Sequence, residues 1–217
     1  MKLADPHSLT ARLRKSIATE HEAIERTPFS MALMAGDLQR ETYVTNLVQM
    51  HRVHRTFEDL CGGQAKLTPY FTDSMRRADV LARDIAQLGY DQASFGILPE
   101  THRIVTEIKQ SNTAQPLSLL GGIYILEGSR MGSMVLAKPL SKCLQISGLP
   151  GTGIDYHVDG ARETPVRLKQ WKQRVDQADF EESIAADIEA FAVMFMQGLL
   201  DMYAAMPMSG SVNRIVA

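Results

Sequence analysis

The spacing of apolar residues predicts a chain made of helices. Leu9, Leu13, Ile17 and Ile24 recur at helical intervals after Ser8, a favoured N-cap residue type, and the pattern stops at residues 27–28. Similar patterns cover residues 38–61, 75–88, 99–110, 119–136, 165–175 and 180–203, with a short helical turn at 29–36. Runs of β-branched residues are few, so the pattern indicates an all-α fold.

Glycine and proline mark the ends of these segments. Gly62-Gly63, Gly89 and residues 148–151 stop helices, and residues 152–164 have the irregular composition of a long loop. No internal repeat and no linker-like stretch divides the chain. We therefore expect a single-domain helical bundle over residues 1–205, followed by a flexible tail rich in Met, Ser and Gly over residues 206–217.

Charge and composition narrow the class of partner. The 217 residues include 23 basic and 25 acidic side chains, so nothing favours nucleic acid as a ligand. We find no uncharged apolar run of the roughly 18 residues that a membrane span needs, and we expect a cytoplasmic protein without a membrane partner. Cys61 and Cys143 lack metal-ligand spacing and fit two buried thiols in a reducing compartment. A small organic ligand is the natural partner.

Residues 119–136 carry the strongest functional signal. They have the length and apolar content of a buried helix, yet four of them are glycine, and each interior glycine costs a helix about 0.5–1 kcal/mol relative to alanine. At about 100° per residue, Gly121, Gly128 and Gly132 fall within about 40° of one another, which leaves one face without side chains. The pairs Gly128-Ser129 and Gly132-Ser133 favour a kink. The pattern predicts a bent helix whose bare face admits either a ligand or a second helix.

His21 is the candidate ligand on the first helix. It lies at the edge of the apolar stripe, with Arg14 seven residues before it and Glu25 four residues after it on the same flank. A carboxylate one turn away can fix the tautomer of a histidine ring and raise its basicity, as happens around metal-bound histidines. Taken alone, a histidine at such an edge is more often a residue at the rim of the core.

A histidine-bearing helix, a glycine-faced helix and nearby basic residues together suit a flat, dianionic, iron-bearing macrocycle. That description fits haem. A haem held edge-on between two helices needs a proximal ligand on one side. On the other side it needs backbone close enough to leave room only for a small diatomic molecule.

Two stretches resemble the haem oxygenase family, and specifically its bacterial, bacteriophytochrome-associated branch. Residues 13–21 (LRKSIATEH) are similar to the family's N-terminal pattern leading to the proximal histidine. Residues 120–133 (LGGIYILEGSRMGS) are similar to its distal-helix pattern, Leu-Gly-x-x-Tyr-x-x-Glu-Gly-Ser-x-x-Gly-Gly, and this match is the more specific one. Softer matches follow in the same order at residues 53–58 (VHRTFE), 81–89 (LARDIAQLG), Trp171 and 185–200.

The resemblance implies a haem oxygenase-like fold and oxygen-dependent opening of haem to biliverdin, carbon monoxide and ferrous iron, with haem as both substrate and cofactor. Electrons would come from a separate reductase or ferredoxin, and a bacteriophytochrome is the implied acceptor of biliverdin. The resemblance makes His21 the proximal iron ligand, steadied by Glu25. It also places Gly128 and Gly132 over the haem on the distal side.

The resemblance further implies a basic edge for the haem propionates. Arg14 corresponds to the position that pairs with a propionate, and Tyr124 is a second candidate there. The predicted helix at 165–175 adds positive charge at the same edge through Lys169, Lys172 and Arg174.

Three distal residues depart from the common family pattern. Ser129 stands where many members have an acidic residue for a water network that delivers protons, although the bacteriophytochrome-type members also have serine there. Ser133 replaces the second glycine of the usual pair, and its hydroxyl would either join that network or crowd oxygen. Arg130 is unusual beside the distal turn and fits a solvated side chain.

Two other readings stay open on the sequence. A non-catalytic haem-binding protein of the same fold would carry the same His21 and the same glycine face. A di-iron or thiamine-pyrimidine-type enzyme of a related helical bundle would use His51, His54 and Glu58, which are spaced to lie on one helix face. Against the second reading, His54 lies on the core stripe, and a second Glu-x-x-His motif is missing.

Overall fold

The structure, a computed structural model, describes residues 7–208, which form helices joined by turns and loops and contain no β-strand. This confirms the all-α prediction. Short 3₁₀ segments connect some of the helices, namely η1 (Ala65–Leu67), η2 (Asp73–Met75), η3 (Gln92–Ser94), η4 (Pro116–Leu119) and η5 (Met134–Leu136). The helices are α1 (Leu9–Ser16), α2 (Ala18–Glu25), α3 (Pro28–Ala35), α4 (Arg40–Gly62), α5 (Ala78–Gln87), α6 (Pro99–Ala114), α7 (Leu120–Ser133), α8 (Ala137–Leu144), α9 (Asp155–Val158), α10 (Thr164–Asp176) and α11 (Glu182–Ala204).

The first predicted helix is in fact two helices. Ser8 caps α1 as expected, accepting a hydrogen bond from the backbone amide of Ala11. The helix then breaks at the buried Ile17, whose φ of −101° and ψ of 3° are not helical. The hydroxyl of Ser16 donates to the carbonyl of Leu13, a side-chain bond that competes with regular helix hydrogen bonding. The break gives α2, which carries His21, a direction of its own.

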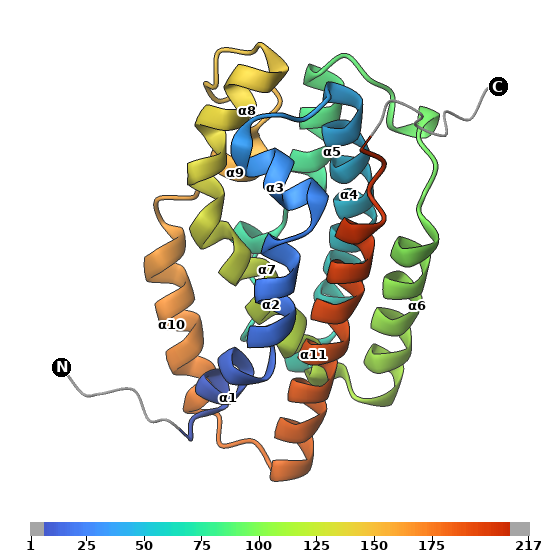
Figure 1. Cartoon of the computed structure of the whole chain (residues 1–217). Helices are drawn as coiled ribbons and strands as arrows, with labels where there is room; N and C mark the ends of the chain where they lie inside the picture. The colour runs from blue at the N-terminus through green and yellow to red at the C-terminus, as the bar shows by residue number, and fades with distance from the viewer. Residues whose placement is uncertain (1–6, 209–217) are drawn as a thin grey trace.

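Two 23-residue helices, α4 and α11, form the centre of the bundle. α11 packs against α1, α2, α3, α6 and α7, and Figure 1 shows it running along the molecule beside α2. Phe57 of α4 meets Phe195 of α11 with ring centroids 5.3 Å apart. By length and composition alone α11 could cross a membrane, but core helices also pass that test, and α11 packs against helices around it.

The glycines of α7 serve two different purposes, which corrects the prediction of one bare face. A Cβ on Gly121 would lie 2.4 Å from the carbonyl oxygen of Ile188, and one on Gly122 would lie 2.2 Å from the ring of Phe57. These two glycines let α7 pack closely on α11 and α4. At Gly128 and Gly132 a Cβ would meet nothing within 4 Å. The bare, open face is therefore limited to the second half of the helix.

Beyond α7 the chain differs from the predicted pattern in several boundaries. The predicted kink is a 3₁₀ segment, η5, which joins α7 to α8, and Pro139 lies in the first turn of α8, where no helical amide bond is lost. The predicted loop at 152–164 contains the short helix α9. At the C-terminus Met206 is buried and the carbonyl of Pro207 accepts a hydrogen bond from Thr42, while residues 209–217 of the predicted tail lie outside the described residues.

Candidate functional site

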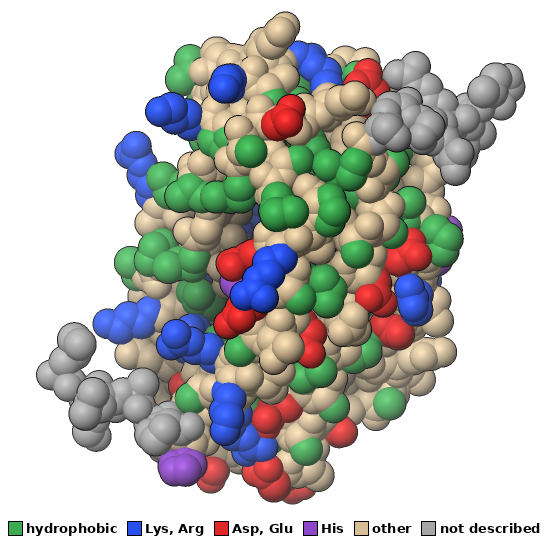
Figure 2. Space-filling view, in the orientation of Figure 1, with side chains coloured by type: hydrophobic (Ala, Val, Ile, Leu, Met, Phe, Trp, Pro, Cys, Tyr) green, Lys and Arg blue, Asp and Glu red, His purple; other side chains and the backbone are tan. Residues whose placement is uncertain are grey.

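The front of the molecule carries an open face between α2 and the second half of α7. None of the eight residues of α2 is buried. Hydrophobic side chains form a band across this face in Figure 2, and the surface is hollowed to the left of α2. Large exposed apolar residues occur on the elements next to it, on α3 (Met31 and Met34) and on α7 and η5 (Met131, Met134 and Val135). Exposed apolar residues gathered on one face indicate a ligand or partner that covers them.

His21 stands on the exposed side of α2. Its side chain is 60% exposed, and Nδ1 lies 3.6 Å from a carboxylate oxygen of Glu25. No hydrogen bond to Nε2 occurs within residues 7–208, so the second ring nitrogen is available to a ligand. The carboxylate of Glu25 thus stands beside one ring nitrogen while the other can bind a metal.

The distal candidates lie on α7 with their hydroxyls engaged in the helix. Ser129 donates to the carbonyl of Leu126 at 2.8 Å, and Ser133 donates to the carbonyl of Ser129 at 3.1 Å. Such bonds to carbonyls three or four residues back bend a helix. Each hydroxyl oxygen can still accept a hydrogen bond. Gly128 and Gly132 directly precede these serines, one turn apart, and have no side chain to fill the open face.

A cationic cluster closes one edge of this face. Lys172 of α10 places Nζ 5.2 Å from the ring centroid of Tyr124 on α7. Burial, and then the nearby charge of Arg14, lower the pKa of Lys172, while Asp176 acts in the opposite direction. Burial also raises the pKa of Tyr124, which Arg14 opposes. Two cations that repel one another beside a tyrosine hydroxyl make a favourable place for a carboxylate.

The other two basic residues of α10 do not join this cluster. Arg174 donates to the carbonyl of Pro69, in the loop before η2, and so points toward a different part of the surface. Lys169 is exposed, one turn before Lys172, and makes no hydrogen bond or ion pair within the described residues. Of the three basic residues predicted on α10, Lys172 is therefore the one that reaches Tyr124.

The histidines of α4 are engaged elsewhere. Nδ1 of His51 contacts the side-chain amide of Gln92 at 2.7 Å, and Nε2 of His54 hydrogen-bonds the hydroxyl of Tyr156 at 3.1 Å. Glu58 accepts from the backbone amides at positions 77 and 78. No group of three metal-ligating side chains occurs within residues 7–208. A cavity of about 10 Å³ beside His54 and Glu58 is about the size of one water molecule, far too small for a macrocycle.

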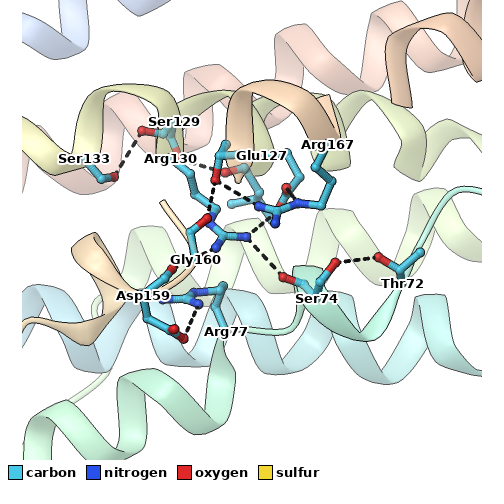
Figure 3. A network of polar contacts seen from close by, with 12 residues as sticks. Thr72, Ser74, Arg77, Glu127, Ser129, Arg130, Ser133, Asp159, Gly160 and Arg167 are labelled. Atoms are coloured by element: carbon cyan, nitrogen blue, oxygen red, sulfur yellow. Dashed lines mark hydrogen bonds and ion pairs between the residues drawn. The ribbon is translucent and has the colours of Figure 1, made fainter. Parts of the chain in front are cut away.

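Arg130 is buried, so the prediction of a solvated side chain is wrong. Only 4% of Arg130 is exposed, and its guanidinium reaches back from α7 into the molecule (Figure 3). It pairs with the carboxylate of Glu127 at 3.1 Å, and Glu127 also accepts from Nε of Arg167 at 2.8 Å. Sequence reasoning missed this network, although the i, i+3 spacing of Glu127 and Arg130 was a signal for it.

Comparison with known protein families identifies the family of this chain. The family model described as heme oxygenase matches residues 7–194, which include α2, α7, α10 and most of α11. The chain belongs to the haem oxygenase family. Membership and fold imply an oxidoreductase that degrades haem, as the resemblance predicted. No match is found among curated protein sequences.

Solved haem oxygenases share the fold of this chain. The enzyme from Leptospira interrogans is 19% identical, with a TM-score of 0.82 over 91% of this chain and 98% of that one. Haem oxygenase-1 of the cyanobacterium Synechocystis sp. PCC6803, solved with haem, is 16% identical, with a TM-score of 0.80 over 90% of both chains. Haem oxygenase-2 of Synechocystis, solved with haem and NO, is 18% identical, with a TM-score of 0.74 over 91% of this chain and 87% of that one.

Sequence reasoning about this haem oxygenase also missed the apolar border of the open face. The sequence analysis did not single out Met31, Met34, Met131 and Met134 as candidate ligand-facing residues. Their exposure depends on how α3 turns after Thr27 and how η5 leaves α7, which periodicity does not give. Methionine suits a surface that binds an apolar ligand, because its unbranched, polarizable side chain adapts to the shape of the ligand.

Proposed function

We propose that this protein cleaves haem to biliverdin, carbon monoxide and ferrous iron at the open face between α2 and α7. When bound there, haem supplies both the oxygen-activating iron and the ring that is opened, and a separate reductase or ferredoxin supplies electrons. We place the reaction in the cytoplasm and propose a bacteriophytochrome as one acceptor of the biliverdin. The residues of this chain bind the ring, orient it and limit what else reaches it.

The observation that carries the proposal is the pair of open glycines on α7 together with the exposed histidine on α2. The space beside Gly128 and Gly132 is empty of protein atoms, so a flat ring can approach the α7 backbone directly. His21 supplies a ring nitrogen, and Glu25 stands beside the other one. Iron is commonly held by a histidine whose second nitrogen meets a carboxylate or carbonyl. The site thus fits haem on chemical grounds.

The propionate edge of the haem would face Arg14, Tyr124 and Lys172. We assign these residues to the haem propionates, because two carboxylates there would neutralise the repulsion between Arg14 and Lys172. We assign the hydroxyls of Ser129 and Ser133 to water on the distal side. Each can accept a hydrogen bond from a water molecule while its own proton stays on a helix carbonyl. No strong acid is needed in that role.

The test compares His21→Ala with His102→Ala. His102 is also an exposed histidine on a helix, but it lies on α6, away from the open face. We expect hemin to give a Soret band with the wild type and with His102→Ala. In His21→Ala the histidine-ligated spectrum should be lost, and turnover should fall by at least tenfold. Circular dichroism of the two variants should be unchanged, because neither side chain is buried.

Addition of ferredoxin with its reductase, under air, separates the enzyme from a haem carrier of the same fold. Decay of the Soret band into the broad red absorption of biliverdin supports the proposed reaction. A band that persists with reductant and oxygen would mean that the protein binds haem without cleaving it. A wild-type Soret band that His21→Ala leaves unchanged would contradict the assignment of His21.

A further inference from the structure

The segment that faces the proposed haem site contains one buried side chain. Within residues 128–137, all of which the structure describes, Arg130 is the only buried residue. The others are exposed or half-buried. At the end of the segment, Leu136 and Ala137 are half-buried and pack against the core. From Gly128 to Val135 the one buried side chain is that of Arg130, which reaches back from the side opposite the open face.

Arg130 ties α7 to two other parts of the chain. Its Nη1 donates to the carboxylate of Glu127 at 3.1 Å and to the backbone carbonyl of Ser74 at 3.2 Å. Its Nη2 donates to the backbone carbonyl of Asp159 at 3.0 Å. Figure 3 shows the guanidinium between the η2 segment and the turn at 159–160. One side chain thus joins α7 to segments 56 and 29 residues away in the sequence.

The partner carboxylate is itself fixed by α10. Glu127 is 2% exposed, and its second oxygen accepts from Nε of Arg167 at 2.8 Å. Arg167 also donates to the hydroxyl of Thr164 at 3.0 Å. The carboxylate between two guanidiniums holds Arg130 in one orientation, because a buried charge that left this position would lose its partner. Arg130 and Glu127, together called the anchor below, therefore connect α7 to three segments, namely η2, the turn at 159–160 and α10.

The turn at Gly160 is shaped around this guanidinium. Gly160 has a φ of +63°, a conformation that favours glycine, and a Cβ there would lie 3.0 Å from Nη2 of Arg130. The first half of α7 is fixed in a different way, by the close packing of Gly121 against α11. The two halves of the helix therefore have independent attachments, and only the second half borders the open face.

We propose that Arg130 is a positioning residue that sets the height and tilt of the α7 backbone from Gly128 to Ser133 over the haem. This rests on the function proposed above. The backbone there limits the space on the distal side of the ring, so its position governs how a small ligand tilts and which meso carbon is opened. Arg130 acts from the far side of the helix and touches neither haem nor oxygen.

The first experiment needs no haem and measures amide hydrogen exchange in Arg130→Met. Arg167 still pairs with Glu127 in this variant, so no buried carboxylate is left alone and folding should be retained. We expect the amides of residues 128–136 to exchange at least tenfold faster, with α4 and α11 unchanged. Arg130→Lys keeps a charge beside Glu127 but offers one nitrogen in place of two, and it should give an intermediate effect.

Arg77→Met is the matched control. Arg77 is 3% exposed and binds the same 155–159 segment, through the carboxylate of Asp159 and the carbonyls of Asp155 and Tyr156, but it makes no hydrogen bond to α7. It should loosen α9 and leave residues 128–136 protected. Unchanged exchange of 128–136 in Arg130→Met would overturn the proposal. Equal acceleration in both variants would also overturn it, because the effect would then be general.

The second experiment uses the haem-loaded protein. Arg130→Met should bind hemin within threefold of the wild type, because the proximal side is untouched, while the carbon monoxide stretching band broadens or shifts. The biliverdin formed should become a mixture of meso isomers. Arg130→Lys should give an isomer mixture intermediate between those of Arg130→Met and the wild type. A wild-type carbon monoxide band in Arg130→Met would contradict the positioning role. If the wild type itself binds no haem, the proposed function fails, while the exchange experiment still tests the anchor.

Discussion

At the scale of single residues, the four glycines of α7 show how the same residue type serves packing and function in one helix. Gly121 and Gly122 are needed because backbone or ring atoms lie within 2.4 Å of where a Cβ would stand. Gly128 and Gly132 have no such neighbour and still carry the helix-propensity cost of glycine. A residue that weakens a helix and relieves no contact is best explained by something that binds there.

This difference predicts opposite results for two substitutions. Gly132→Leu should leave the unfolding free energy of the haem-free protein unchanged or raise it by up to about 1 kcal/mol, because leucine favours the helix. It should block haem binding or turnover. Gly121→Ala should instead destabilise the protein by about 1–3 kcal/mol, since its Cβ would press on the carbonyl of Ile188. Urea unfolding and hemin titration of both variants check this, and full activity in Gly132→Leu would mean that the open face is not the site.

At the scale of elements, the sequence predicted the helices well where periodicity is long and poorly where packing decides. The long helices α4 and α11 agree with their apolar patterns within a few residues. The break at Ile17 and the short helix α9 were missed, since each depends on contacts with distant segments. His21, Glu25 and Tyr124 could be proposed from motif resemblance. The sequence could not show that Lys172, and not Lys169 or Arg174, reaches Tyr124. That depends on the direction in which each α10 side chain leaves the helix.

That selection leads to a prediction for α10. Lys172→Gln should weaken hemin binding by about 1 kcal/mol, roughly fivefold, because it removes one charge-assisted contact to a propionate at a partly exposed edge. Lys169→Gln, one turn away and exposed, should change the affinity by less than twofold. The affinity for haem dimethyl ester, which has no free carboxylate, should be the same in both variants and the wild type. A loss for the ester equal to that for hemin would show that Lys172 acts through packing.

At the scale of the whole molecule, the proposed site lies on an open face, whereas one cluster of buried titratable groups lies between α4, α5 and α9. His54, Asp84, Tyr156 and His157 pack between α4, α5 and α9, and Asp84 accepts from the backbone amides of Asp155 and Tyr156 at 3.0 and 2.7 Å. Burial, the main cause, lowers the pKa of His54 and of His157 to about 3. Burial raises the pKa of Asp84 to about 6, against those two amides. The free energy of unfolding should therefore depend on pH.

The sign of this sensitivity follows from which state binds more protons. Between about pH 4 and 6 each buried histidine is neutral when folded and mostly charged when unfolded, so stability rises with pH by about 1.4 kcal/mol per unit per histidine. Asp84 is protonated when folded and ionised when unfolded, so it contributes the same slope with the opposite sign. Two positive slopes and one negative slope therefore add up. Together the three groups should raise the free energy of unfolding by about 1.4 kcal/mol per pH unit across this range.

His157→Phe isolates one of these contributions. Neither ring nitrogen of His157 has a hydrogen-bond partner within the described residues, and its ring packs against Tyr156 with centroids 5.1 Å apart, so phenylalanine keeps the aromatic contact and removes the titrating group. In urea unfolding of the haem-free protein from pH 4 to 6, the slope of stability against pH should fall by about 1.4 kcal/mol per unit relative to the wild type. His102→Phe is the control: it removes a histidine that is exposed on α6, and it should change the slope by less than about a third as much. Equal slopes for the wild type and His157→Phe would mean that His157 is already protonated in the folded protein, and its burial would then need a counter-charge that the structure does not provide.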